Sequence, residues 1–167
     1  MAYFKYFPTI RYDVRGTKNS RSVQLVTDIL KRVRKRLDIV NRAYFEQYFV
    51  KDGDTPESLA HQVYGDSTLH WIILYGNYMT NPYYDWPLTY IDLKKFVIKK
   101  YGEANINDTH HYEDADGYEV DSTASGATAV TNFVYEETLN DAKRTINVIK
   151  SEYTQEIVSE FKKIIVE

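Results

Sequence analysis

The chain has 167 residues, contains no cysteine and carries a formal net charge of −3. This length supports one ordinary domain with its own buried core, and the lack of cysteine excludes disulfides and thiolate metal sites. The N-terminal MAYFKYFPTI has no signal-peptide pattern, and the longest apolar run, WIILY, is far too short to cross a membrane. We therefore expect a protein that is neither exported nor membrane-bound.

Charged and aromatic residues are distributed unevenly along the chain. Residues 1–50 carry 11 basic and 4 acidic side chains, whereas residues 103–142 carry 10 acidic side chains and no basic ones. The 16 tyrosines, 7 phenylalanines and 2 tryptophans exceed what a core of this size needs. Aromatic residues are enriched at protein interfaces, and opposite potentials steer docking. The composition thus favours a protein with large contact surfaces toward other copies or neighbouring proteins.

Residues 1–45 are predicted to form an extended arm followed by a basic helix. Aromatic and β-branched residues, followed by the break RGTKNS, predict an arm with one short strand. Thr27 can cap a helix whose apolar positions are Ile29, Val33, Leu37 and Val40. The basic run KRVRKR within it is most simply a solvated face. An acidic protein partner is an alternative, and nucleic acid is a weaker one because no aromatic residues interleave the run.

Residues 46–102 are predicted to form a strand and three helices. FEQYFV reads as the strand, and Thr55 caps a helix from Pro56 to about Tyr64 that Gly65 ends. Asp66 or Ser67 caps a second helix that ends near Gly76 and Asn77. NPYYDWPL is predicted to be a rigid aromatic loop, and TYIDLKKFVIKKYG an amphipathic helix closed by Gly102.

Residues 103–167 are predicted to contain strands and one final helix. Asp116-Gly117 indicates a hairpin, STASGATA a polar connection, and VTNFVYEE and RTINVI further strands. Ser151 can cap a last helix with Tyr153, Ile157, Phe161 and Ile164 on one face. The predicted fold class is α+β, in three parts: 1–45, 46–102 and 103–167.

No catalytic, cofactor or metal residues are predicted. His110 and His111 lie beside acidic residues, but neighbours on a strand point to opposite faces, so a hairpin edge is favoured over a metal site. DADGYE lacks the later glutamate of a calcium loop. His61 and His70 are expected to be structural, and no nucleophile elbow, phosphate-binding loop or zinc-protease helix is present. An enzyme is therefore the less favoured class.

The stretch from Tyr48 to Asn77, with GDTPESLA and YGD, resembles the lysin motif (LysM). The resemblance implies a small βααβ module, which in that family binds N-acetylglucosamine chains of peptidoglycan or chitin. The usual approach to the closing strand is absent, and NPYYDWPL stands in its place. The module scaffold is predicted to consist of Gly53, Thr55, Leu59, Ala60, Tyr64, Gly65, Leu69, Trp71 and Leu74.

Several motifs in order along the chain resemble a second family. FPTIRYD, VTDILKR, YGDSTLHWIILYGN, NPYYDWPL, KKYG and YEETLNDAKRTINVIKSEY resemble the LysM-containing baseplate wedge protein fifty-three family of contractile-tailed, T4-like bacteriophages. The resemblance implies a non-enzymatic structural subunit of the virion tail baseplate, assembled in the host cytoplasm. It implies six copies arranged around the baseplate and not a free homo-oligomer. Its implied role is to clamp neighbouring wedges around the hub, and a peptidoglycan- or chitin-binding protein is the alternative.

The implied partners are other baseplate wedge subunits, including wedge core proteins and the lysozyme-like subunit that initiates the sheath; neither nucleic acid nor membrane is expected. Aromatic residues braced by prolines lose little entropy on docking, and Trp and Tyr are typical hot spots, so a partner contact is expected around Trp86. Packing of this cluster on the module's own helices is the alternative. The predicted partner-binding residues are Phe4, Phe7, Ile10, Tyr12, Tyr83, Tyr84, Asp85, Trp86 and Pro87. Whether Glu136, Asn140, Lys143 and Arg144 pair within the chain or across a contact stays open.

Overall fold

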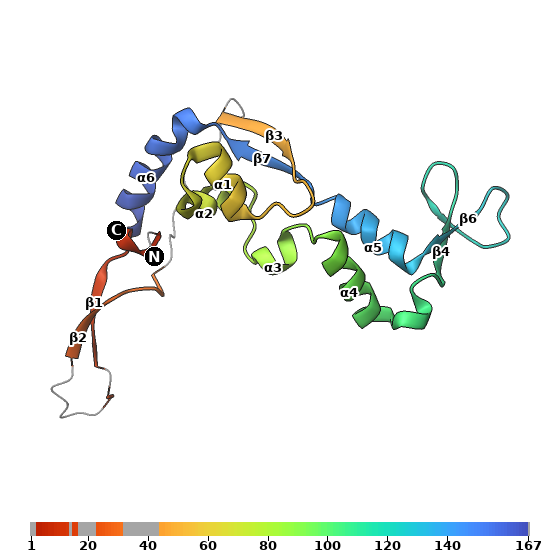
Figure 1. Cartoon of the computed structure of the whole chain (residues 1–167), viewed down its shortest axis with the longest axis horizontal. Helices are drawn as coiled ribbons and strands as arrows, with labels where there is room; N and C mark the ends of the chain where they lie inside the picture. The colour runs from red at the N-terminus through yellow and green to blue at the C-terminus, as the bar shows by residue number, and fades with distance from the viewer. Residues whose placement is uncertain (1–2, 14, 17–22, 32–43, 167) are drawn as a thin grey trace. The chain divides into compact units, whose positions relative to one another are not determined.

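The computed structural model describes residues 3–13, 15–16, 23–31 and 44–166 (Figure 1). Helices and strands both contribute, which confirms the predicted α+β class. The chain forms two compact units, each assembled from segments that are distant in sequence. The first unit consists of Met1–Glu46, Thr55–Asn77 and Asn147–Glu167, and the second of Gln47–Asp54 and Tyr78–Ile146. The C-terminal helix therefore belongs with the first unit and not with the acidic hairpin that precedes it.

The first unit begins with a 3-10 turn, Tyr3–Tyr6, and a two-stranded antiparallel ribbon. Strand β1, Thr9–Asp13, pairs with β2, Val23–Thr27. The predicted helix cap at Thr27 is wrong, because the alternating segment VQLVT pairs as a strand and Thr27 is its last residue. The rest of that predicted helix, residues 32–40, lies outside the described part of the chain.

Two helices of the first unit follow the predicted caps. Helix α1, Pro56–Tyr64, begins with a capping box in which Thr55 and Ser58 exchange side-chain and backbone hydrogen bonds. It ends at Gly65, whose φ of +72° places it in the left-handed region that glycine tolerates best. Asp66 caps a 3-10 turn that leads into α2, His70–Gly76. These boundaries confirm the predicted ones.

The core of the first unit forms between α2, the end of strand β7 (Thr145–Ile149) and helix α6 (Thr154–Val166). A 3-10 turn, Ser151–Tyr153, precedes α6, so Ser151 does not cap this helix as predicted. The rings of Trp71 and Phe161 pack with their centroids 4.5 Å apart. The buried cluster comprises Trp71, Ile72, Ile149, Ile157, Val158, Phe161 and Ile165.

Strand β3, Phe45–Phe49, pairs with β7 to form a second two-stranded sheet. The Lys150 amide donates to the Tyr44 carbonyl at one end, and the Val50 amide donates to the Arg144 carbonyl at the other, so the strands are antiparallel. Strand β3 is followed along the chain by α1 and α2, and its partner strand β7 comes much later in the sequence. Together these four elements have the order βααβ. The segment between α2 and β7 forms most of the second unit.

Three helices lie in the second unit. Helix α3, Pro82–Asp85, occupies the segment that was predicted to be a loop, because the Asn81 side chain caps it and Pro82 favours its first turn. Helix α4, Tyr90–Tyr101, is capped by Thr89 and ends at Gly102, as predicted. Helix α5, Asn132–Asp141, packs against α4.

The prediction of a strand over VTNFVYEE is wrong from Asn132 onward, since α5 begins there. The Thr131 hydroxyl accepts a hydrogen bond from the Val134 amide and caps the helix. The buried residues of α5 are Asn132, Glu136 and Asn140, which are four residues apart. Its inner face is therefore polar, and a search for apolar periodicity does not detect it.

The acidic region of the second unit is a three-stranded antiparallel sheet. Strand β4, Thr109–Glu113, lies between β5, Glu119–Val120, and β6, Thr128–Thr131. The predicted hairpin at Asp116-Gly117 connects β4 and β5. All of residues 103–131 are described, and none of them is buried. No helix in the described ranges is long and apolar enough to cross a membrane.

Candidate functional site

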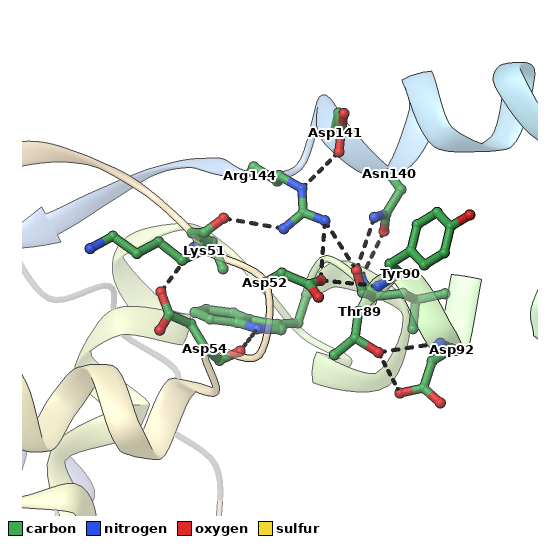
Figure 2. Close-up of polar contacts among 12 residues, drawn as sticks. Lys51, Asp52, Asp54, Thr89, Tyr90, Asp92, Asn140, Asp141 and Arg144 are labelled. Carbon is green, nitrogen blue, oxygen red and sulfur yellow. Dashed lines mark hydrogen bonds and ion pairs between the residues drawn. The ribbon is translucent and has the colours of Figure 1, made fainter. Parts of the chain in front are cut away.

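A polar network in the second unit holds the turn that follows β3 (Figure 2). Arg144 lies at its centre, with a guanidinium group that is largely buried. Its Nε donates to Asp141 Oδ1 at 2.7 Å, its Nη1 to the Val50 carbonyl at 3.2 Å and its Nη2 to the Leu88 carbonyl at 3.4 Å. Asp52 Oδ1 lies 3.7 Å from Nη2. The planar fork of arginine suits such bridging, so one side chain joins three segments.

Asn140 reinforces the same connection. Its amide nitrogen donates to the Leu88 carbonyl at 3.0 Å, and its amide oxygen accepts from the Leu88 backbone N–H at 2.7 Å. Asn140 is buried on the inner face of α5. A buried backbone group that loses such a partner costs free energy, so this amide fixes the segment between α3 and α4.

The two carboxylates of the turn itself, residues 51–54, bind groups of their own unit. Asp54 Oδ2 accepts from the Lys51 amide and from the Tyr48 hydroxyl, both at 2.9 Å. Burial, and then the neighbouring Asp54 carboxylate, raise the pKa of Tyr48. Asp52 Oδ1 accepts from the Tyr90 amide at 3.0 Å. The carboxylates of the turn therefore serve the fold.

Trp86 is part of this framework. Only 8% of its surface is exposed, and its indole N–H donates to the Asp54 carbonyl at 2.9 Å. The next residue in the chain, Pro87, is also buried. The structure thus gives Trp86 an internal role, and the partner contact expected around it stays a prediction. A sequence pattern cannot separate the two cases, because a tryptophan braced by proline suits either a core or an interface.

Two tyrosines of α3 are exposed instead. Tyr83 is 89% exposed and Tyr84 is 73% exposed. Asp85 is partly buried, and its Oδ2 accepts from the amides of Thr80 and Asn81 at 2.9 Å, which fixes the loop before the helix. Of the five residues predicted around this helix, only these two have large exposed aromatic surfaces.

Glu136, Asn140, Lys143 and Arg144, whose pairing the sequence left open, all have partners within the second unit. The buried Glu136 carboxylate accepts from Lys100 Nζ at 2.6 Å and from the Tyr101 hydroxyl at 2.8 Å. The hydrogen bond to Glu136 raises the pKa of Lys100, and desolvation is the main cause of the raised pKa of Tyr101. Lys143 Nζ donates to the Tyr84 carbonyl at 2.7 Å.

The predicted contact residues of the N-terminal arm divide into two groups. Phe4 and Phe7 are partly buried, and Phe7 lies near Phe161 of α6, with ring centroids 6.3 Å apart. Ile10 and Tyr12 on β1 are exposed. The arm is thus packed at its start and exposed along the ribbon.

The opposite strand adds exposed apolar residues that the sequence prediction missed. Leu25 is 72% exposed and Val23 is also exposed. The β-branched and apolar residues of VQLVT are a signal for this strand, and the sequence analysis used only Thr27 of this segment, as a helix cap.

The residues predicted as module scaffold lie in and around α1 and α2. Leu59, Ala60 and Trp71 are buried, whereas Leu69 and Leu74 are partly buried. Burial also raises the pKa of the Tyr64 hydroxyl. Gly53 has a φ of +88° in the turn after β3, which explains the glycine there.

The two adjacent histidines do not point to opposite faces. Thr109 is opposite Thr131 and His111 is opposite Val130, so His110 is the extra residue of a β-bulge. The Nδ1 atoms of the two imidazoles are 2.9 Å apart, and His111 Nε2 lies 2.8 Å from Glu113 Oε1. Among the residues that the structure describes, no group of three or more histidine or acidic side chains could hold a metal ion.

Comparisons with known proteins agree with the wedge-family resemblance. The model of the family described as base plate wedge protein 53 matches residues 2–125. A curated relative, baseplate wedge protein gp53 of Enterobacteria phage T4, is 27% identical over 99 residues, which cover 59% of this chain and 50% of the relative. The match thus spans about half the length of the relative. Since the family model covers well over half of the chain, the protein belongs to the base plate wedge protein 53 family.

Proposed function

We propose that this chain is a non-enzymatic structural subunit of a phage tail baseplate wedge, and that it joins neighbouring wedges during assembly around the hub. The family match over residues 2–125 carries this proposal. The proposed partners are other wedge subunits, including wedge core proteins and the lysozyme-like subunit that initiates the sheath. The proposal places six copies in the virion baseplate, which assembles in the host cytoplasm.

Two exposed surfaces support a joining role. One is the ribbon of β1 and β2, where Ile10, Tyr12 and Leu25 are exposed. The other is helix α3, with Tyr83 and Tyr84. Tyrosines are typical anchors of protein interfaces, and contiguous exposed apolar side chains often mark interaction sites.

Reconstitution of wedges with purified subunits of the same phage tests the proposal. Leu25→Asp and the double variant Tyr83→Ala, Tyr84→Ala are each expected to reduce the yield of joined wedges seen by electron microscopy. Val166→Asp and Tyr118→Ala are matched controls, because both residues are comparably exposed and lie on other elements. Normal joining by both test variants would count against the assigned surfaces, and joining without this chain would refute the proposed function.

Binding of peptidoglycan or chitin is the second candidate. The βααβ order of β3, α1, α2 and β7 favours it, and we propose that these elements form a lysin-motif-like module. In lysin-motif proteins the turn after the first strand helps to shape the sugar groove. Here the carboxylates of Asp52 and Asp54 in that turn already bind groups of their own unit.

We therefore favour a module whose turn has been committed to internal contacts. A pull-down on purified peptidoglycan and chitin decides between the two candidates. Saturable binding that N-acetylglucosamine oligomers compete would establish the sugar function.

A further inference from the structure

The adjacent histidines His110 and His111 lie where the sheet of β4, β5 and β6, which we call the acidic sheet, meets two helices of the second unit. The ring of His110 stacks on Tyr135 of α5, with centroids 3.9 Å apart and an angle of 11° between the rings. The ring of His111 packs against the same tyrosine at nearly a right angle, with centroids 5.7 Å apart. Tyr101, the last residue of α4, packs against His110 with centroids 6.3 Å apart. The histidine pair thus connects the acidic sheet to both helices.

Glu113 determines where the hydrogens of the neutral pair lie. An ionised carboxylate can only accept, so His111 Nε2, which is 2.8 Å from Glu113 Oε1, carries a hydrogen. A neutral imidazole has one N–H, so His111 Nδ1 has to accept. The hydrogen in the 2.9 Å contact between the two Nδ1 atoms therefore belongs to His110. Neutral His110 is the Nδ1–H tautomer and neutral His111 is the Nε2–H tautomer.

The contact between the rings can hold one added proton but not two. With one, His111 is the cation, because its Nδ1–H can donate to His110 Nδ1 while its Nε2–H still donates to Glu113. With two, both Nδ1 atoms carry hydrogens that point at each other across 2.9 Å, and like charges face each other. The His111 side chain is only 11% exposed, so little water screens this repulsion. A second proton therefore requires the rings to separate.

The ionisable neighbours of the pair do not remove this limit. Glu113 lies opposite Glu119 of β5, and these carboxylates attract protons to the pair without widening the contact between the two rings. Strand β6, Thr128–Thr131, carries no ionisable side chain. On the helices the ionisable neighbours are Tyr135 and Tyr101, with the ion pair of Lys100 and Glu136 to which Tyr101 donates. Histidine is the side-chain type among them whose ordinary titration falls between about pH 5 and 8.

We propose that the histidine pair is a proton-dependent latch, which holds the acidic sheet against α5 while the pair carries at most one added proton. Binding of the second proton separates the rings and loosens the bulge at His110, so that β4 can shift against α5. The segment before β4 stays in place, because the amides of Asn132 and Phe133 donate to the carbonyls of Asp108 and Ile106. The loosened sheet binds both protons and the latched sheet binds one, so acid favours loosening.

Nuclear magnetic resonance of the isotope-labelled full chain tests the proton count directly. At about pH 8 we expect the Nδ1–H tautomer for His110 and the Nε2–H tautomer for His111. Lowering the pH to about 5 should add the two protons in separate steps, and the second step should change the ring resonances of Tyr135. Two histidines that take up protons independently, with no change at Tyr135, overturn the inference.

Hydrogen exchange of the amides in residues 109–131 measures the loosening. After correction for the intrinsic pH dependence of exchange, protection of β4 and β6 should fall on the order of tenfold between about pH 8 and 5. His110→Gln keeps an N–H that can donate to His111 Nδ1 but cannot become a cation, so the fall should disappear. His61→Gln is the matched control, because His61 is exposed on α1 of the first unit, and it should behave like the wild type.

An equal fall in His110→Gln overturns the inference, as does protection in the wild type that does not change with pH. If His110→Gln does not fold, the proton count of the wild-type chain still decides. Neither measurement involves the joining of wedges, so a failed latch leaves the proposed function intact, and a chain that does not join wedges can still contain the latch.

Discussion

Replacing Trp86 by alanine should lower the stability of the second unit and not merely remove a binding contact from its surface. Trp86 is only 8% exposed, and its indole N–H donates a hydrogen bond to the Asp54 carbonyl. Truncation of a buried tryptophan to alanine costs about 3–5 kcal/mol. Because whole domains are stable by only about 5–15 kcal/mol, this loss should remove a large share of the stability of the second unit and lower its melting temperature.

Thermal and urea unfolding followed by circular dichroism measure this effect. Trp86→Phe keeps a large ring but loses the indole hydrogen bond, so an intermediate cost of about 1–3 kcal/mol is expected. Tyr83→Ala is the matched control, because that ring is 89% exposed and its loss should change stability by less than about 0.5 kcal/mol. If Trp86→Ala melts like the wild type while wedge joining is lost, the internal role of Trp86 is refuted and the expectation from sequence is restored.

Three further predictions concern the contacts that build the two units. Asn140→Leu removes both hydrogen bonds to the Leu88 backbone and should lower the free energy of unfolding by about 2–3 kcal/mol, measured by urea unfolding; a loss below the error of that measurement would contradict the clamp. Because the hydrogen bond to Glu136 raises the pKa of Lys100, its contribution is complete below the ordinary lysine value of 10.5 and is lost as the pH rises through the raised value. Unfolding measured at neutral pH and well above pH 10.5 should therefore show an alkaline loss of stability that is smaller in Lys100→Met, and an identical pH profile in that variant would exclude the pair as a cause. Gly65→Ala should cost about 1 kcal/mol through its left-handed backbone, although no neighbour lies within 4 Å of the added carbon, and an unchanged melting temperature would show that the turn relaxes.

The local signals of the sequence predicted the helices of the first unit well. Thr55, Gly65 and Asp66 act through hydrogen bonds and backbone angles within a few residues, so their effect does not depend on distant segments. The same holds for Thr89 and Gly102 around α4. The order of motifs along the chain also indicated the family, which the match over residues 2–125 confirms.

Other features depend on partners that are distant in sequence. Helix α5 was predicted as a strand because its buried face is made of Asn132, Glu136 and Asn140, and polar residues are stable there only with partners on α4 and in the loops near it. The histidine pair depends on a bulge, which shifts the register by one residue and brings neighbouring side chains to the same side.

The sequence by itself determined the caps of α1 and α4 and of the turn before α2, the acidic hairpin, the excess of aromatic residues and the family. Only the tertiary structure decided which aromatic residues are exposed. Trp86 is buried and donates to a carbonyl 32 positions earlier in the chain, whereas the rings of Tyr83 and Tyr84 are exposed. It also showed that β7 pairs with β3, which lies about a hundred residues earlier in the chain. The physical reason is that caps and turns are local, whereas burial depends on which distant segments close over a side chain.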